Sequence, residues 1–165
     1  MSHIEGAIRE MQTRVGEMES AVLAIPEVWL TWRPSPEVWS ILDNLCHVEE
    51  FIPYWMGQIR AMVTRPQEEW GRTHADPDRL AAVADTAGRK REDILPSIHA
   101  RLDAVCTELL AMDDGMLEIE APSRNPRWDV KPASFVLDQL LVHHLASHCG
   151  QIQRNIHQLQ QADEK

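Results

Sequence analysis

Residues 132–161 read PASFVLDQLLVHHLASHCGQIQRNIHQLQQ, and this stretch decides the fold. Its apolar residues recur at every third or fourth position, which is the spacing of one face of an α-helix. Pro132 suits the first position of such a helix, where its missing N–H costs nothing. The stretch therefore predicts an amphipathic helix that buries one face against partner helices.

Three earlier segments show the same spacing, at residues 2–25, 35–64 and 86–112. A capping-box sequence, SHIE, opens the first of them, and Ser35 followed by Pro36 opens the second. A shorter helix is expected to begin at Asp76-Pro77, and residues 121–132 are expected to form a loop. Four amphipathic helices with almost no strand predict an all-α fold, a four-helix up-and-down bundle, in a single domain spanning residues 1–165.

The charge of the chain argues against nucleic acid as a partner. Its 26 acidic residues outnumber 16 basic ones and give a formal charge of −10, and such a field repels phosphate backbones. No apolar stretch approaches the roughly 18 residues that a membrane helix needs. Glutamates interrupt the N-terminal region where a signal peptide would be apolar. We therefore expect no membrane partner and a cytoplasmic location.

The three cysteines, Cys46, Cys106 and Cys149, show no C-x-x-C spacing. They predict neither a disulfide framework nor a zinc-thiolate site, and reduced, buried thiols are expected. Cys46 adjoins His47 and Cys149 adjoins His148. Because adjacent residues on a helix point about 100° apart, packing is the favoured role for both cysteines.

Two histidines occupy the buried stripe of the last helix, which runs Leu137, Leu141, His144, His148, Ile152. Residues four apart on a helix lie about 40° apart around its axis, so their side chains share one face. His144 and His148 can therefore reach one ion. They stand where the pattern favours leucine, and an unpaired polar group there costs about 1–3 kcal/mol.

A third histidine, His47, is expected beside this pair. It lies eleven residues after Pro36, while His144 and His148 lie twelve and sixteen residues after Pro132. If the second and fourth helices run in the same direction, a rise of about 1.5 Å per residue places the three at roughly 17, 18 and 24 Å along their helices. The matched heights predict a divalent metal site. The alternative is a set of core histidines held by ordinary hydrogen bonds.

The same residues carry a resemblance to a known family. The sequence WSIL at residues 39–42 followed by His47, and HLASHCGQI at residues 144–152, resemble the DinB/YfiT-like superfamily of metalloenzymes. The W-x-P-x-P-x-x-W sequence from Trp32 to Trp39 also resembles the entry into the second helix of that family. The resemblance covers essentially the whole chain, and it implies a four-helix bundle, metal ligands at His47, His144 and His148, and, as in many members, a homodimer.

Three neutral imidazoles leave positions open on a metal ion, which is typical of catalytic rather than structural sites. Imidazole ligands suit zinc and nickel. Family members include thiol-cofactor S-transferases, a thiol-dependent maleylpyruvate isomerase and hydrolase-like proteins. The resemblance therefore implies a metal-activated low-molecular-weight thiol or water that attacks a small electrophilic substrate, as in a transferase or hydrolase. The alternative is a non-catalytic bundle in which metal or buried histidine serves stability or binding.

Several neighbours of these histidines are weaker candidates. Glu50, one turn after His47, can orient a ligand or take a fourth metal position, and a solvated glutamate is the simpler expectation. Gln151 can hydrogen-bond near the site, and His143 would replace His144 if the helix register shifted by one residue. Four tryptophans can line a pocket mouth or simply pack in the core: Trp29, Trp32, Trp39 and Trp55. The sequence identifies no catalytic residue and no site for a thiol cofactor.

Overall fold

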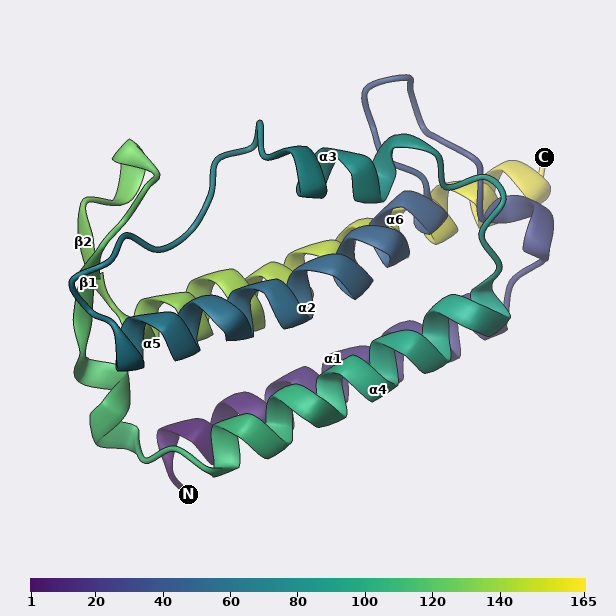
Figure 1. Ribbon diagram of the computed structural model, residues 1–165. Coiled ribbons are helices and arrows are strands. Elements are labelled where there is room, and N and C mark those ends of the chain that lie inside the picture. Colours follow the sequence, from purple (N-terminus) through teal and green to yellow (C-terminus); the bar gives the residue numbers. More distant parts are fainter.

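Four long helices pack side by side in the computed structural model, which describes residues 1–165 (Figure 1). They are α1 (His3–Leu23), α2 (Ile41–Thr64), α4 (Arg91–Leu110) and α6 (His143–Asp163). The last of them continues from the short α5 (Ala133–Phe135) and a π-helical segment, η4 (Val136–Val142). The remaining elements are α3 (Pro77–Ala84), the 3₁₀ turns η1 (Glu27–Trp29), η2 (Asp114–Glu118) and η3 (Pro126–Trp128), and the antiparallel strands β1 (Glu120–Pro122) and β2 (Val130–Pro132). The predicted all-α four-helix bundle is confirmed.

Contacts between α2 and the last helix fix their relative direction. Asn44 bonds to His148, whereas Phe51, two turns later in α2, stacks on His144. Later residues of α2 thus meet earlier residues of α6, so the two helices are antiparallel, as Figure 1 also shows. The expectation that these two helices run in the same direction is wrong.

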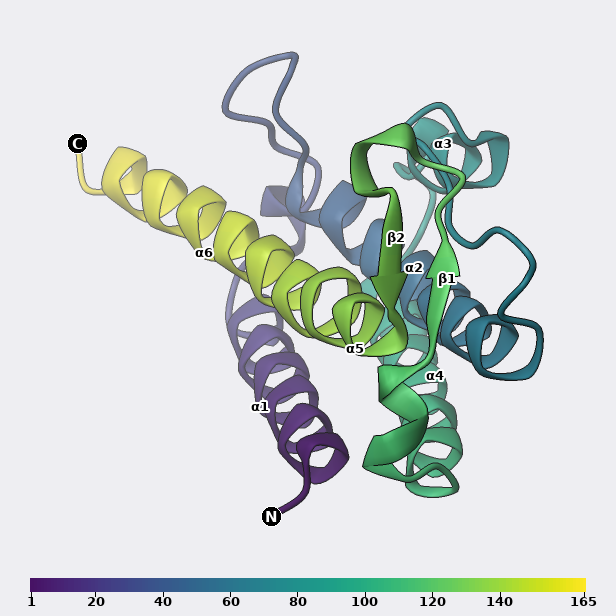
Figure 2. The same ribbon diagram turned by 90° about the vertical axis from the view of Figure 1, so that its left-hand side faces the viewer.

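The connection between α2 and α4 explains the difference. Residues 65–90 cross back over the bundle and carry α3, so α4 starts at the same end as α2 (Figure 1). The contacts agree with this direction, because Glu49 meets Arg101 and Arg60 meets Glu108. The β1–β2 hairpin then covers the other end of the bundle, where α5 begins (Figure 2).

The second helix begins later than predicted. Ser40 rather than Ser35 is its N-cap. The Ser40 hydroxyl accepts the Asp43 backbone N–H at 3.0 Å, and the Asp43 carboxylate accepts the Ser40 N–H at 2.9 Å. Thr86 reinforces this buried capping box by donating its hydroxyl to Asp43 at 2.6 Å. A box held from a distant segment outcompetes the local Ser35-Pro36 signal, so His47 lies in the second turn of the helix.

The bounds of other elements differ from the predicted ones as well. α4 begins at Arg91 rather than near Thr86, and the short helix expected at Asp76-Pro77 is present as α3. Residues 121–132, expected as a loop, form most of the β1–β2 hairpin with η3 at its tip. The last helix, expected to be α-helical throughout, contains the π-helical segment η4, a geometry that recurs at functional sites.

The core follows the predicted apolar spacing in α1 and in the last helix. The buried side chains of α1 include Ile4, Ile8, Met11, Val15, Met18 and Val22. The start of α2 is different, because Asp43, Asn44 and His47 are fully buried there beside leucines and isoleucines. Buried polar groups need internal partners, so this end of α2 must be joined to polar groups on other elements.

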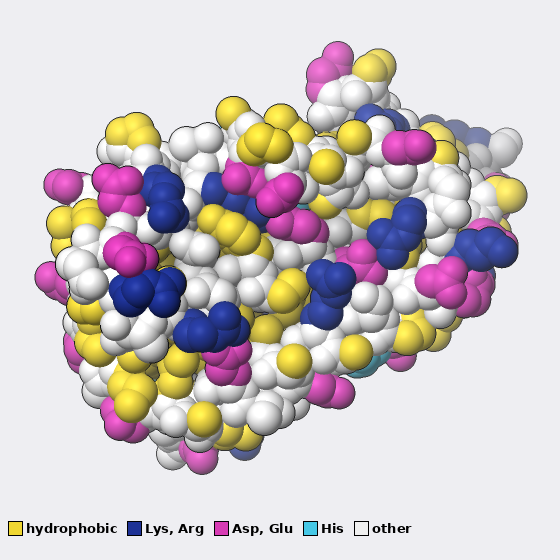
Figure 3. All heavy atoms as spheres, in the orientation of Figure 1, with side chains coloured by type: hydrophobic (Ala, Val, Ile, Leu, Met, Phe, Trp, Pro, Cys, Tyr) yellow, Lys and Arg dark blue, Asp and Glu magenta, His cyan; other side chains and the backbone are white.

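The surface carries no feature that favours a nucleic-acid partner on the face that Figure 3 shows. Lys and Arg side chains there are mixed with Asp and Glu side chains over the whole face. None of the helices has the length and apolar character that crossing a membrane requires.

Candidate metal centre

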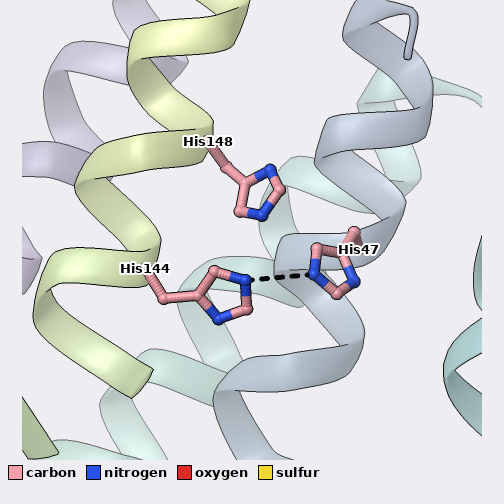
Figure 4. A group of neighbouring side chains, drawn as sticks. All are labelled: His47, His144 and His148. Carbon is pink, nitrogen blue, oxygen red and sulfur yellow. Dashed lines mark hydrogen bonds between the residues drawn. The ribbon is translucent and has the colours of Figure 1, made fainter. Parts of the chain in front are cut away.

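His47 from α2 meets His144 and His148 from α6 in the space between the two helices (Figure 4). One ring nitrogen of each histidine lies within 4.8 Å of those of the other two. The Nε2 atoms of His47 and His144 are 3.3 Å apart. The structure therefore brings the three predicted residues together, and we refer to them as the histidine trio.

Two rings of the trio are oriented by hydrogen bonds at Nδ1. His148 Nδ1 donates to the side-chain oxygen of Asn44 at 2.7 Å, and His144 Nδ1 donates to the Leu140 carbonyl at 3.2 Å. Amide and carbonyl oxygens only accept, so both rings carry their proton on Nδ1 and leave the Nε2 lone pair free. Asn44 is fixed in turn, because its amide nitrogen donates to the Ser40 carbonyl at 2.9 Å. Both α6 histidines can thus coordinate a metal ion through Nε2 without a change of tautomer.

His47 completes the trio from the interior of the bundle. It is only 1% exposed, and its Nδ1 has no hydrogen-bond partner. If His47 Nε2 donates a hydrogen bond to His144 Nε2, the lone pair on His144 Nε2 is satisfied. The lone pair on His148 Nε2 then still has no donor within the trio. A cation between the three rings engages all three lone pairs at once. The donor set therefore fits a divalent ion that prefers imidazole nitrogen.

Aromatic side chains enclose the histidine trio. Trp39 stacks on His148 with ring centroids 5.7 Å apart, and its ring meets His47 edge-on at 5.0 Å. Phe51 stacks on His144 at 4.0 Å. These contacts hold the imidazoles in place and exclude water from their flanks. Of the tryptophans considered from the sequence, Trp39 and Trp55 are the two placed at the site.

The surroundings keep the histidine trio uncharged at neutral pH. Burial lowers the pKa of His47 to about 2, of His148 to about 3 and of His144 to about 4. The positive charge of Arg79 lowers all three pKa values further. A neutral imidazole is the form that binds metal, so no proton has to be displaced from Nε2 of His144 or His148.

A cavity of about 210 Å³ opens beside the trio, and His47 and His144 form part of its wall. Three arginines also line it, and none of its lining residues is Asp or Glu. The arginines are Arg72, Arg79 and Arg127. A second hollow, of about 290 Å³, is lined in part by Trp39, Asn44 and His148. Small molecules therefore have access to the histidines.

Glu50 binds an arginine rather than a histidine. Its two carboxylate oxygens accept hydrogen bonds from Arg72 at 2.6 and 2.7 Å. The Arg72 side chain is 5% exposed and lies 3.7 Å above the centre of the Tyr54 ring. Glu50 is thus outside the histidine trio, and the simpler expectation of a solvated glutamate is wrong because the residue forms a largely buried ion pair.

The other candidates near the trio take structural roles. Cys46 and Cys149 are free and buried, and burial raises the pKa of each thiol to about 11. His143 is exposed and outside the trio, so no register shift occurs. Gln151 donates to Asn155 at 2.8 Å and makes no hydrogen bond to a histidine. These arrangements agree with the packing role expected for the two cysteines.

Sequence reasoning missed Asn44 and the two inner arginines of the cavity. Asn44 lies one turn before His47 on the same helix, and this spacing could have identified it as a neighbour of the site. Arg72 lies in the irregular segment after α2, and Arg79 lies in the short helix α3 that follows it. Their place beside the histidines depends on how that segment folds back over the bundle.

Comparisons with known proteins agree with this fold. A family model described as the DinB superfamily matches residues 11–152, and no curated protein is similar enough in sequence to match. The structure of YfiT from Bacillus subtilis, described as a probable metal-dependent hydrolase with an unusual four-helix bundle topology, has a TM-score of 0.81 at 12% identity and covers 96% of this chain and 90% of that one.

Two further solved structures share the fold. A conserved protein from Enterococcus faecalis has a TM-score of 0.73 at 11% identity, covering 94% of this chain and 96% of that one. A mutant of the mycothiol-dependent maleylpyruvate isomerase has a TM-score of 0.67 at 9% identity, and the match covers 90% of this chain but 60% of that longer one. At these identities the likeness concerns the fold, and the family resemblance predicted from the sequence is confirmed by the family model.

Proposed function

The chain belongs to the DinB superfamily, and from this premise we propose that it is a metal-dependent enzyme whose ligands are His47, His144 and His148. The observation that carries the proposal is the convergence of three neutral imidazoles, two of them with Nδ1 protons fixed by hydrogen bonds. Zinc or nickel suits such a donor set. Three protein ligands leave at least one position open, which is the pattern of catalytic metal sites.

A divalent ion in this site supplies Lewis acidity and lowers the pKa of a water or thiol bound to it. The residues of the chain supply the rest. Asn44 and the Leu140 carbonyl hold the imidazole rings, while Trp39 and Phe51 keep water from their flanks. Arg79 adds positive charge near the site, which favours anionic nucleophiles and anionic transition states.

The reaction class is a nucleophilic attack by water or a low-molecular-weight thiol on a small electrophile. The likeness to YfiT, described as a probable metal-dependent hydrolase, supports water, and the likeness to a mycothiol-dependent isomerase supports a thiol. The cavity beside the trio, at about 210 Å³, suits a small substrate. A homodimer, which the resemblance implies, and a cytoplasmic location belong to the same proposal.

A second candidate function is a non-catalytic bundle in which the metal serves stability. The burial of His47 in the core favours it, because an ion between α2 and α6 would join the two helices. The two functions differ in what the cavity does: an enzyme needs it for substrate, whereas a structural metal does not.

The test compares metal-free protein with protein reloaded with zinc, nickel, manganese or iron. Each form is assayed for hydrolysis of activated esters and for conjugation of a small thiol to an electrophile, and its melting temperature is recorded. Turnover that requires metal and is lost in His47→Ala, but kept in His157→Ala, supports the enzyme, because His157 is an exposed residue of α6 that lines neither hollow. A large rise in melting temperature on loading, with no turnover under any metal, would establish the structural role instead.

A further inference from the structure

The cavity beside the histidine trio has a charge opposite to that of the chain around it. The chain carries a formal charge of −10, yet the cavity is lined by three arginines and by no Asp or Glu. A concave site lined with one sign of charge concentrates ligands of the opposite sign. The lining therefore favours an anionic ligand over a neutral or cationic one.

The most buried of these arginines is already neutralised. Arg72 forms a two-bond pair with Glu50 and lies 3.4 Å from a carboxylate oxygen of Asp76. Its guanidinium also lies over the Tyr54 ring. Arg72 thus helps to build the wall of the cavity, and its charge is largely compensated by its own neighbours.

Arg79 is compensated less completely, because the carboxylates of Glu50 and Asp76 act on its guanidinium only at a distance. Its guanidinium donates to the His74 carbonyl at 3.2 Å and forms no ion pair. The nearby Asp76 carboxylate instead caps α3 by accepting the backbone N–H of Arg79 at 3.0 Å. Burial lowers the pKa of Arg79, and so does the charge of Arg72. A half-buried cation without a carboxylate partner is costly, so Arg79 is prepared to accept an anion from outside the chain.

Arg79 also lies close enough to the trio to hold a molecule that reaches it. Its guanidinium carbon is 5.7 Å from the centre of the Trp39 ring. That ring packs directly on His47 and His148. Arg127, at the hairpin tip, adds a second cation without an acidic partner, and its guanidinium lies 5.8 Å from the Trp128 ring. An anion bound to Arg79 is therefore beside the site of the proposed chemistry.

We propose that the substrate is a small carboxylic acid, with its carboxylate bound to Arg79 and its electrophilic centre facing the histidine trio. The planar guanidinium fork matches the two oxygens of a carboxylate, and the small cavity leaves room for little beyond a short carbon chain. The inference rests on the proposed function and names the substrate class for the same site.

The experiment titrates malonate and its neutral diamide, malonamide, into metal-free and zinc-loaded protein and measures affinity by calorimetry. Wild-type protein is compared with Arg79→Gln and with Arg9→Gln, a control at an exposed arginine of α1. Malonate is expected to bind at least about 10-fold more tightly than malonamide in both forms, and Arg79→Gln to weaken malonate by about 10-fold or more. The Arg9→Gln variant should bind as the wild type does.

Circular dichroism checks that Arg79→Gln folds, and Arg79→Lys provides a second variant that keeps the charge but loses the fork. An intermediate malonate affinity in Arg79→Lys supports the proposal. Equal binding of malonate to wild type and Arg79→Gln, or binding of malonamide as tight as that of malonate, overturns it. Inorganic phosphate that binds more tightly than malonate and is lost in Arg79→Gln also overturns it, in favour of a phosphate substrate.

The metal-free arm separates this inference from the proposed function. If malonate binds through Arg79 in a protein that takes up no zinc, the carboxylate site is supported and the proposed metal-dependent function is contradicted. Zinc uptake at one ion per chain, without selectivity for malonate, does the reverse.

Discussion

The two helix pairs of the bundle, α1 with α4 and α2 with α6, differ in the kinds of residue that they bury. The buried residues of α1 and α4 are apolar apart from one cysteine, Cys106. The pair α2 and α6 buries polar residues as well, among them Asp43, Asn44 and Asn155, and places the histidine trio between them. Apolar stripes are sufficient to pack a bundle, as α1 and α4 demonstrate. The polar residues of the second pair therefore serve a purpose other than packing.

The buried polar groups of the α2–α6 pair also hold neighbouring residues of the site in place through hydrogen bonds. Asn44 holds His148 at 2.7 Å, and Asn155 donates to the Trp39 carbonyl at 2.9 Å, which fixes the segment whose ring covers His47 and His148. Each such group is costly if left unpaired. Both pairs bury apolar side chains in the core, whereas ligand chemistry is expected to depend on the α2–α6 pair.

The largest expected effect on stability lies in the apolar pair. Ile98→Ala removes a fully buried side chain of α4 and should lower the free energy of unfolding by about 2–5 kcal/mol, because a cavity remains. Urea denaturation measures the loss. Zinc affinity of the folded variant should not change, and a fall in affinity comparable to that of a site variant would show that the two pairs are not separable.

A smaller effect is expected where the polar pair supports the trio. Asn44→Ala removes the acceptor that orients His148 and should weaken metal binding about 10- to 100-fold, measured by competition with a chelating dye. Asn155→Ala is the comparison variant and should weaken metal binding less, since this buried asparagine bonds to Trp39 and Gln151 and acts on the trio only through Trp39. Equal losses of affinity in both variants would contradict the role assigned to Asn44.

His47→Leu sharpens the comparison by making the second pair resemble the first. The change removes a buried ring whose Nδ1 has no partner, so the metal-free variant should be more stable than metal-free wild type by about 1–2 kcal/mol. Calorimetric melting of the two metal-free proteins measures this. A lower melting temperature for the variant would indicate that His47 contributes to the fold itself.

The smallest effect is expected at the cysteines. Burial raises the pKa of Cys46 and Cys149 to about 11, and a raised pKa reduces the reactive thiolate fraction at any lower pH. Native protein at pH 8 should therefore react with iodoacetamide far more slowly than urea-unfolded protein, and the rate should rise as the pH approaches 11. Rapid labelling of Cys149 in native protein at pH 8 would instead reveal a reactive thiol near the site.

The sequence was sufficient for the features that local spacing encodes. The helical periodicity located all four long helices, and the four-residue separation of His144 and His148 placed both on one face. His47 has the predicted neighbours, although α2 starts later than the comparison of helix heights assumed and runs antiparallel to α6. The family motif was therefore the sounder guide to His47. The single-domain extent and the homodimer stay predictions.

The features that were missed depend on contacts between distant segments. Ser40 caps α2 because Asp43 is held by Thr86, which lies in the connection after α3. That same connection sets the direction of α4 and brings Arg72 and Arg79 to the cavity. No local pattern encodes how residues 65–90 cross the bundle, so neither the helix directions nor the charge of the cavity could be predicted.

Metal binding by the histidine trio is tested most directly by elemental analysis of untagged protein prepared without chelators. Wild type, His144→Ala and His143→Ala are compared side by side. His143 is the matched control, because it adjoins His144 but lies outside the trio. We expect about one zinc or nickel ion per chain in wild type and His143→Ala and a loss of that metal in His144→Ala. Metal content unchanged in His144→Ala, or no metal in wild type after reloading with zinc, nickel, manganese and iron, would contradict it.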